Sequence, residues 1–172
     1  MKKIKNLIFL ILLVFVVGFV NAQTKVAHIN SQELISIMPE MELAKAEFSK
    51  LQKSLSDDIQ NLINNYRKKA DQYSDETPSK TKAENENRIN ELDDLKAQIQ
   101  KAQISAEKEA EEKYIELTEP IKEKALSAIQ KVGREKGFSV ILDSTNESVF
   151  LLKDSVLTDL MEAVKEELGI NN

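Results

Sequence analysis

The chain has 172 residues, with 24 basic and 29 acidic side chains and a net charge of −5. This acidic balance argues against nucleic-acid binding, which depends on neutralising phosphates with positive charge. Aromatic residues make up only 5% of the chain, Trp is absent, and Gly and Pro number 4 and 3, which excludes a large globular core with many turns. A composition rich in Ala, Glu, Lys, Leu and Gln indicates long paired helices instead.

The first 22 residues are predicted to be a secretory signal peptide. Three lysines precede an apolar run from Leu7 to Val17, and Ala22 is a small residue suited to cleavage. The alternative is an uncleaved membrane anchor, but the longer apolar run from Leu7 to Val20 is interrupted by Gly18 and is shorter than the roughly 20 residues that a spanning helix needs. We therefore expect export and cleavage near Ala22. Removing those three lysines from the net charge of −5 leaves −8 for the mature chain.

The front of the mature chain predicts a strand, a short helix and then a very long helix. The strand runs from Lys25 to Asn30, and Ser31 is a plausible N-cap for a helix through Ile37. Pro39 is tolerated in a first helical turn and begins the long helix. The only break in about a hundred helix-forming residues is the segment DETPS at 75–79. At about 1.5 Å per residue, each half could reach on the order of 50 Å and fold back as a projecting hairpin.

The returning half leads into a second group of short elements. Pro120 lacks an amide donor and predicts a kink, while Gly137 is a suitable C-cap. Alternation at 138–143 predicts a strand, and STNE at 144–147 predicts a hairpin turn into a further strand at 149–152. The last predicted element is an amphipathic helix capped by Asp154 or Ser155, with Leu157, Leu160, Met161, Val164 and Leu168 on one face and Gly169 at its end.

Apolar residues recur in both long helices at a mean step of about 3.6, the period of a straight helix. The outgoing seam is Ala44, Phe48, Leu51, Leu55, Ile59, Leu62, Tyr66, Ala70 and Tyr73. The returning seam is Leu92, Leu95, Ile99, Ala102, Ala106, Ala110, Tyr114, Leu117, Ile121, Ala125, Ile129 and Val132. Two nearly straight antiparallel helices are expected, with the three small alanines opposite bulkier residues such as Leu55, Ile59 and Leu62.

A second apolar stripe lies on the returning helix, at Ile104, Ile115 and Leu126. The spacing of eleven brings each residue back to nearly the same face, roughly 140° from the seam, so the partner helix cannot cover them. One interpretation is that the body or another subunit covers Ile115 and Leu126. The other is that the stripe faces a cavity and contacts a nonpolar client.

The base of the hairpin is too small to be stable by itself. It amounts to roughly 55 ordered residues, fewer than a lone core without metal or disulfide usually needs, and the chain contains no Cys. A homo-oligomer that shares the strands would close their apolar edges. The predicted organisation is a signal peptide at 1–22, body segments at 23–38 and 121–172, and a hairpin arm at 39–120. The fold class is α+β, mostly helical, with a long antiparallel hairpin projecting from a small β body.

Two blocks of sequence resemble the Skp (OmpH) family of periplasmic chaperones. They are VAHIN followed by SQELI at 26–35, with Pro39 opening a long helix, and VGREKGFSVILD at 132–143. The resemblance implies a homotrimer whose three chains build one β body and whose three hairpins enclose a cavity. It also implies a periplasmic protein that holds unfolded outer-membrane proteins without ATP and keeps them from aggregating.

Charge is the main departure from that family pattern. The best-known members are basic, whereas this chain is acidic. The hairpin tip carries five cations among four acidic residues, and a solvated mixed surface is the simpler interpretation. These are Arg67, Lys68, Lys69, Lys80 and Lys82, with Asp71, Asp75, Glu76 and Glu84. Stable membrane contact is therefore not predicted.

No residue pattern predicts an enzyme, a cofactor or a metal site. The single histidine, His28, alternates along a strand and is interpreted as structural. Acidic pairs such as Asp57 and Asp58 point about 100° apart on a helix and are interpreted as exposed surface.

The predicted function is an ATP-independent holdase that encloses its clients between the arms, with Ile104, Ile115 and Tyr73 as candidate client contacts. The alternative is an extracytoplasmic coiled-coil scaffold or adaptor whose hairpin docks one folded partner.

Overall fold

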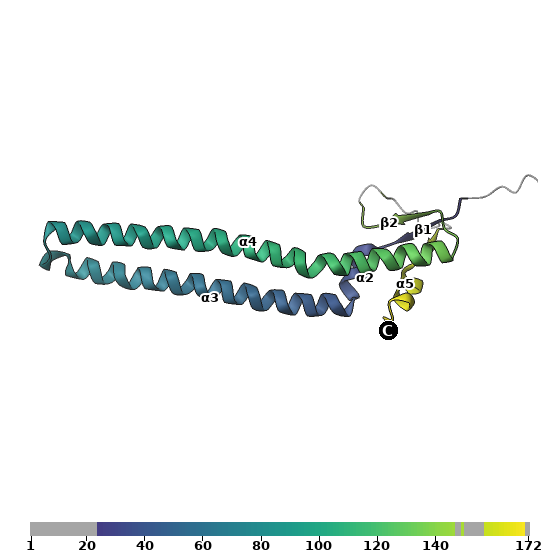
Figure 1. The fold of residues 1–172 in the computed structure, drawn as a ribbon, viewed down its shortest axis with the longest axis horizontal. Helices are drawn as coiled ribbons and strands as arrows, with labels where there is room; N and C mark the ends of the chain where they lie inside the picture. Colours follow the sequence, from purple (N-terminus) through teal and green to yellow (C-terminus); the bar gives the residue numbers. More distant parts are fainter. Residues whose placement is uncertain (1–23, 147–148, 150–156, 171–172) are drawn as a thin grey trace, which may run out of the picture.

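The computed structural model describes residues 24–146, 149 and 157–170. Figure 1 shows a long arm of two helices with a small body at one end. Along the chain come β1 (Val26–Ile29), α2 (Ser31–Ile37), α3 (Pro39–Glu76), the 3₁₀ turn η1 (Thr77–Ser79), α4 (Lys82–Glu135), β2 (Val140–Asp143), β3 (Thr158–Asp159) and α5 (Met161–Glu167). The predicted α+β class, mostly helical with a projecting hairpin, is confirmed. The predicted signal peptide lies outside the described residues.

The arm consists of α3 and most of α4, which run side by side in opposite directions (Figure 1). Pro39 is in the first turn of α3, as predicted. The turn region expected at 75–79 is confirmed, although α3 extends to Glu76 before η1 begins. Thr81 then caps α4 with a complete capping box, in which its side chain accepts from the Glu84 amide and the Glu84 side chain accepts from the Thr81 amide.

Pro120 lies inside α4, which continues through it as one helix to Glu135. Figure 1 shows the axis of α4 bending gently where the arm meets the body, rather than a sharp break. One missing amide donor can be tolerated in a helix of 54 residues because packing holds both sides of the proline. Ile121 and Ala125, just beyond it, are buried in the body core.

The body contains a three-stranded parallel sheet with strand order β2-β1-β3. Val26 pairs with Val140 and Ile29 with Asp143, so the two predicted strands do meet at the base of the hairpin. On the other edge of β1, Ala27 pairs with Thr158. The long connections between neighbouring parallel strands contrast with the expected hairpin of 138–143 and 149–152. Residues 150–152 lie outside the described residues, so that pairing stays a prediction.

The C-terminal helix begins later than the sequence predicted. Thr158 and Asp159 form β3, and α5 starts at Met161, so Leu157 is not helical. The amide of Leu160 donates to the carbonyl of His28, which extends the bonding along the edge of β1. An otherwise open strand edge is satisfied in this way, which outweighs the local helical pattern. The predicted caps at 154–155 lie outside the described residues, while Gly169 ends the helix as expected, with φ of 69°.

A single core joins the sheet, α2, α4 and α5. Ala27 and Ile29 point inward from β1, Leu34 from α2 and Val164 from α5, and all are almost fully buried. Figure 1 shows the end of α4 running between the strands and α5, so the same helix forms half of the arm and the centre of the body. The orientation of the arm is therefore fixed by the body.

Candidate functional site

The seam between the two arm helices follows the predicted register. Leu55 and Ile59 of α3 lie opposite Ala106 and Ala110 of α4, and these side chains line one shallow groove between the helices. Every predicted seam residue is at least partly buried except Tyr114, which is 50% exposed. Its ring nevertheless contacts Phe48 edge to face, with 5.4 Å between the ring centres. The seam thus holds the arm together and leaves the other faces of α4 available.

The second apolar stripe is exposed to solvent in the single chain. Ile104 is 68% exposed, Ile115 53% and Leu126 54%. The interpretation that the body covers Ile115 and Leu126 is wrong within one chain, because the strands approach α4 further along its length. Leu126 does reach the rim of a body groove. Ile104 and Ile115 remain open for contact with another molecule, either a further copy of this chain or a client.

Tyr73, the third predicted contact, lies near the arm tip and is partly buried. Its hydroxyl donates to the Glu91 carboxylate, which also accepts from Lys69. The Arg88 guanidinium carbon lies 4.6 Å from the centre of the Tyr73 ring and its amino group donates to Glu76. These five residues, Lys69, Tyr73, Glu76, Arg88 and Glu91, are called the tip cluster. Tyr73 therefore joins the two helices, and its role as a client contact stays a prediction.

The tip cluster perturbs the proton affinities of its own members. Hydrogen bonds from Lys69 and then Tyr73 lower the pKa of Glu91 below its ordinary value. Hydrogen bonds from Gln72 and Arg88 do the same for the pKa of Glu76. The hydrogen bond to Glu91 raises the pKa of both Lys69 and Tyr73. All four shifts favour the charge states in which the helices attract one another.

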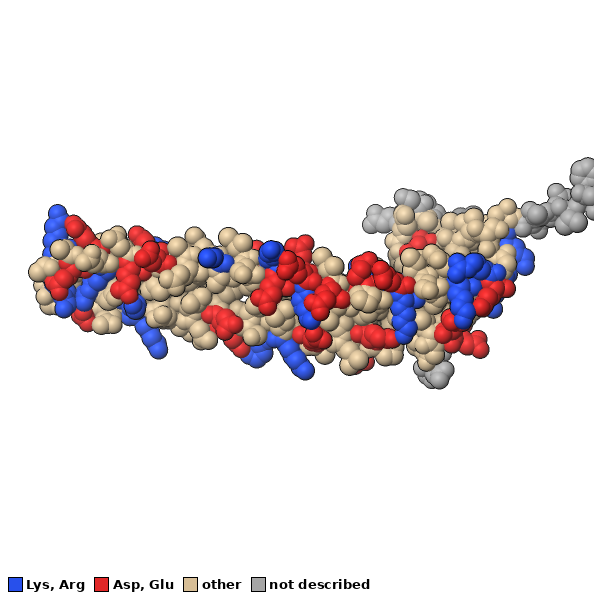
Figure 2. Space-filling view, in the orientation of Figure 1, with Lys and Arg blue, Asp and Glu red and all other residues tan. Residues whose placement is uncertain are grey.

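Charges at the tip are largely paired within the chain. Besides Lys69, the ammonium of Lys80 lies 3.9 Å from Glu84 and that of Lys82 lies 3.8 Å from Glu86. Figure 2 shows blue and red side chains intermingled along the arm, without a broad patch of one sign at the tip. This supports the interpretation of the tip as a mixed solvated surface.

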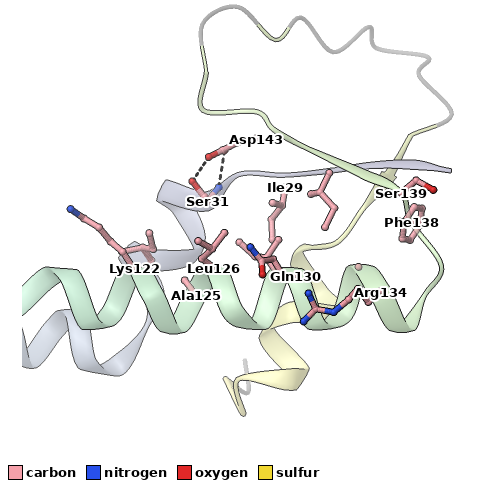
Figure 3. A pocket seen from close by; sticks show the side chains of 14 residues that line it. Ile29, Ser31, Lys122, Ala125, Leu126, Gln130, Arg134, Phe138, Ser139 and Asp143 are labelled. Carbon is pink, nitrogen blue, oxygen red and sulfur yellow. Dashed lines mark hydrogen bonds between the residues drawn. The ribbon is translucent and has the colours of Figure 1, made fainter. Parts of the chain in front are cut away.

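An apolar groove of about 590 Å³ lies in the body between the sheet and α4. Figure 3 shows Leu126 and Ile29 in its wall, and Lys122 and Arg134 of α4 also belong to its lining. Ile141 and Phe138 complete much of the apolar lining. A monomer that leaves such a groove open exposes surface that normally contacts another molecule.

Asp143 ties the sheet to α2 at one end of this groove. Its carboxylate accepts from the backbone amide of Ser31 at 3.2 Å and from the Ser31 hydroxyl (Figure 3). The same carboxylate accepts from the amide and hydroxyl of Thr145, within the part of the predicted turn at 144–147 that the structure describes. Ser31 is thus not the N-cap of α2. Asn30 caps it instead, accepting from the Glu33 amide at 2.9 Å, because the Ser31 hydroxyl is committed to Asp143.

Within the described ranges, no group of three or more His, Cys, Asp or Glu side chains could hold a metal ion. In the same part of the chain, no helix combines the length and the apolar character needed to span a bilayer. His28 sits on β1, partly exposed, with its side chain on the face opposite the buried Ala27 and Ile29.

Comparison with known proteins places this architecture in a family. The family model described as outer membrane protein (OmpH-like) matches residues 25–168. The chain belongs to the OmpH-like family. A solved structure from Caulobacter crescentus, described as a candidate OmpH-like outer membrane chaperone, superposes with a TM-score of 0.71 at 17% identity. The alignment covers 86% of this chain and 85% of that one. No curated protein matches the sequence significantly.

Sequence reasoning located the exposed stripe of this OmpH-like arm but missed the tip cluster and the body groove. A helical period of 3.6 reveals which residues leave the seam, and it needs no partner to be known. The tip cluster joins residues 12 to 22 positions apart across a turn, so only the register of the hairpin brings them together. The charged residues at 69, 76, 88 and 91 lie beside the apolar seam. Charged side chains at such positions could have indicated contacts between the two helices.

Proposed function

We propose that this OmpH-like protein is an ATP-independent holdase chaperone of the periplasm. In this proposal it binds unfolded outer-membrane proteins after their export and prevents their aggregation by enclosing them between helical arms. Membership of the OmpH-like family supports a chaperone role, and the Caulobacter crescentus structure, described as a candidate outer membrane chaperone, has the same fold. The predicted signal peptide at 1–22 supports export.

The observation that carries the proposal is the pair of exposed isoleucines, Ile104 and Ile115, on a face of α4 that the seam does not use. Apolar segments of an unfolded chain gain free energy when such side chains shield them from water. Two isoleucines on one arm give only weak binding. Several arms acting on the same client make the combined binding strong, and each single contact remains quick to break.

Acidic residues lie between these two isoleucines along α4. Glu107, Glu111 and Glu112 are exposed between them, and the mature chain is acidic as a whole. Like charge between the arms and acidic clients would keep contacts short-lived. Weak apolar contacts combined with charge repulsion favour transient binding of an unfolded chain over tight binding at one fixed site.

A homotrimer is the second part of the proposal. Among the described residues, the core comprises only thirteen buried hydrophobic side chains, several of them alanines, and the groove beside it exposes further apolar side chains. A core of this size is marginal for a single domain. Copies that pack against the groove would stabilise the body and place three arms around a shared cavity.

Aggregation of an unfolded outer-membrane β-barrel protein, followed by light scattering, tests the holdase. The variant Ile104→Ser with Ile115→Ser should need about thirtyfold more protein for the same suppression, because two isoleucines at roughly 1 kcal/mol of apolar burial each together contribute about 2 kcal/mol. The matched control is Leu43→Ser, at a side chain that is 71% exposed on α3 but outside the stripe. The control should behave as the parent protein. Equal suppression by all three proteins would refute the client-contact assignment.

The mass of the mature protein in solution tests the trimer. Multi-angle light scattering should give three times the mass of one chain across the concentrations used for the aggregation assay. A well-folded monomer in dilute solution would refute the enclosed cavity. A single stoichiometric partner recovered from the periplasm, in place of many outer-membrane proteins, would favour the adaptor.

A further inference from the structure

The contacts that join α3 to α4 change in kind along the arm. At the body end, Ile121 and Ala125 of α4 are buried together with Met41 and Ala44 of α3. Along the middle, the seam is apolar and only half-buried. At the tip, hydrogen bonds and ion pairs of the tip cluster also cross between the helices. The tip is thus held in part by polar contacts.

Ion pairs that cross from α3 to α4 occur only near the two ends of the arm among the described residues. Near the body, Lys113 lies 2.9 Å from Glu47, and Lys124 pairs with Glu40. Near the tip are the Lys69–Glu91 and Arg88–Glu76 pairs. Between these groups, Lys96 over the Tyr66 ring, at 6.0 Å, is the one charged contact between the helices.

The tip cluster is balanced in charge and accessible to ions. Lys69 and Arg88 carry two positive charges, and Glu76 and Glu91 carry two negative ones. The side chains of Lys69 and Glu91 are 35% and 43% exposed, and those of Arg88 and Glu76 are 16% and 36% exposed. Salt screens pairs at this depth, because the Debye length falls from about 10 Å at 0.1 M to about 3 Å at 1 M.

Apolar side chains near the turn, such as Ala70 and Leu92, are only partly buried. Ile89, the large aliphatic side chain closest to the turn on α4, is 58% exposed and does not seal the helices. Beyond the cluster, the side-chain amide of Asn85 donates to the carbonyl of Thr77 at 3.2 Å, which is a local contact within the turn region.

We propose that the tip cluster is an electrostatic fastening that lets the arm open from its tip while the body stays folded. Opening would separate the last two turns of α3 from the first turns of α4 and would uncover seam side chains such as Ala70 and Leu92. Opening would thereby enlarge the exposed apolar surface of the arm. This inference concerns the arm alone and does not depend on what the arm binds.

Amide hydrogen exchange of the full mature protein without client tests the fastening. In Glu91→Ala, which removes the contacts to both Lys69 and Tyr73, exchange in residues 66–92 should quicken about fivefold, because the cross-helix attraction at the tip is lost. Raising NaCl from 0.05 to 1 M should quicken the same segment in the parent protein. Residues 121–132 should exchange at the parent rate throughout.

The matched control is Glu86→Ala, which removes an equal charge from the same part of α4 but only a contact to Lys82 within that helix. It should exchange at about the parent rate. The double variant Lys69→Glu with Glu91→Lys restores an opposite-charge pair and should recover part of the protection. Glu91→Ala exchanging no faster at the tip than Glu86→Ala, or exchange rising equally in residues 121–132, would overturn the proposal.

Discussion

Gly133 allows α4 and β2 to approach one another closely beside the body groove. It is buried within the last turns of α4, and a Cβ at this position would lie 2.4 Å from Cδ1 of Ile141 and 3.4 Å from its Cγ1. Carbon atoms pack comfortably at about 3.5–4.0 Å, so in Gly133→Ala the Ile141 methyl must move by about 1 Å. The groove beside Ile141 offers room for this movement.

Two opposing contributions set the effect of Gly133→Ala on the free energy of unfolding. Replacing glycine with alanine inside a helix stabilises it by about 1 kcal/mol. Pushing Ile141 away from its preferred rotamer costs about 1 kcal/mol. The net change should therefore be smaller than about 1 kcal/mol. Gly133→Val adds further methyl groups in the same gap and should destabilise by about 2–3 kcal/mol.

A double-mutant cycle separates the two contributions. Ile141→Val removes Cδ1 and should itself cost about 1 kcal/mol. In that background, Gly133→Ala no longer meets Cδ1 and should stabilise by about 1 kcal/mol, which makes the coupling energy about 1 kcal/mol. Urea unfolding at one fixed chain concentration measures all four proteins, since association changes apparent stability. An identical effect of Gly133→Ala in both backgrounds would refute the contact between Gly133 and Ile141 as the cause.

Two further predictions concern polar contacts that position the elements. Asp143→Ala removes the acceptor for Ser31 and Thr145 and should lower the free energy of unfolding in urea by about 2 kcal/mol. Burial raises the pKa of Asp143, but the hydrogen bonds from Ser31 and Thr145 together lower it further, to a net value below the ordinary 3.8. The stabilisation by the Asp143 carboxylate is therefore complete above pH 3.8 and is lost as the pH falls through the lower pKa of the folded protein. In acid, the parent and the variant should have nearly the same free energy of unfolding. A difference that persists unchanged in acid would contradict this role. Thr81→Ala removes the capping box of α4 and should cost about 1 kcal/mol, read as faster amide exchange confined to the first turns of α4; faster exchange in the body as well would argue against a local cap.

The helices were predictable because their signals are local. Pro39, the break at 75–79 and Gly137 mark their ends through backbone geometry that each residue carries with it. Pro120 also shows the limit of that reasoning, since a proline predicts a kink but not whether the helix continues beyond it, as α4 does to Glu135. The packing of Ile121 and Ala125 on the body core decides that outcome, and the sequence around the proline does not by itself predict this packing.

The small elements of the body were harder to predict for the same reason. Ser31 has the side chain of an N-cap, yet Asn30 caps α2 because the carboxylate of Asp143, 112 residues away, accepts a hydrogen bond from the Ser31 hydroxyl. Thr158 and Asp159 lie in a helical pattern, yet they pair with β1 because that edge would otherwise be open. Long-range contacts override local preference where an element is only a few residues long.

The sequence by itself determined that two straight amphipathic helices pair as a hairpin and which isoleucines they leave exposed, because a helical period assigns each residue to a face without reference to any partner. The tertiary structure alone decided the strand order β2-β1-β3, the groove beside Gly133 and the cluster that joins Lys69 to Glu91. Those features depend on which backbone edges and charges meet across a fold, and residues that meet there are far apart along the chain.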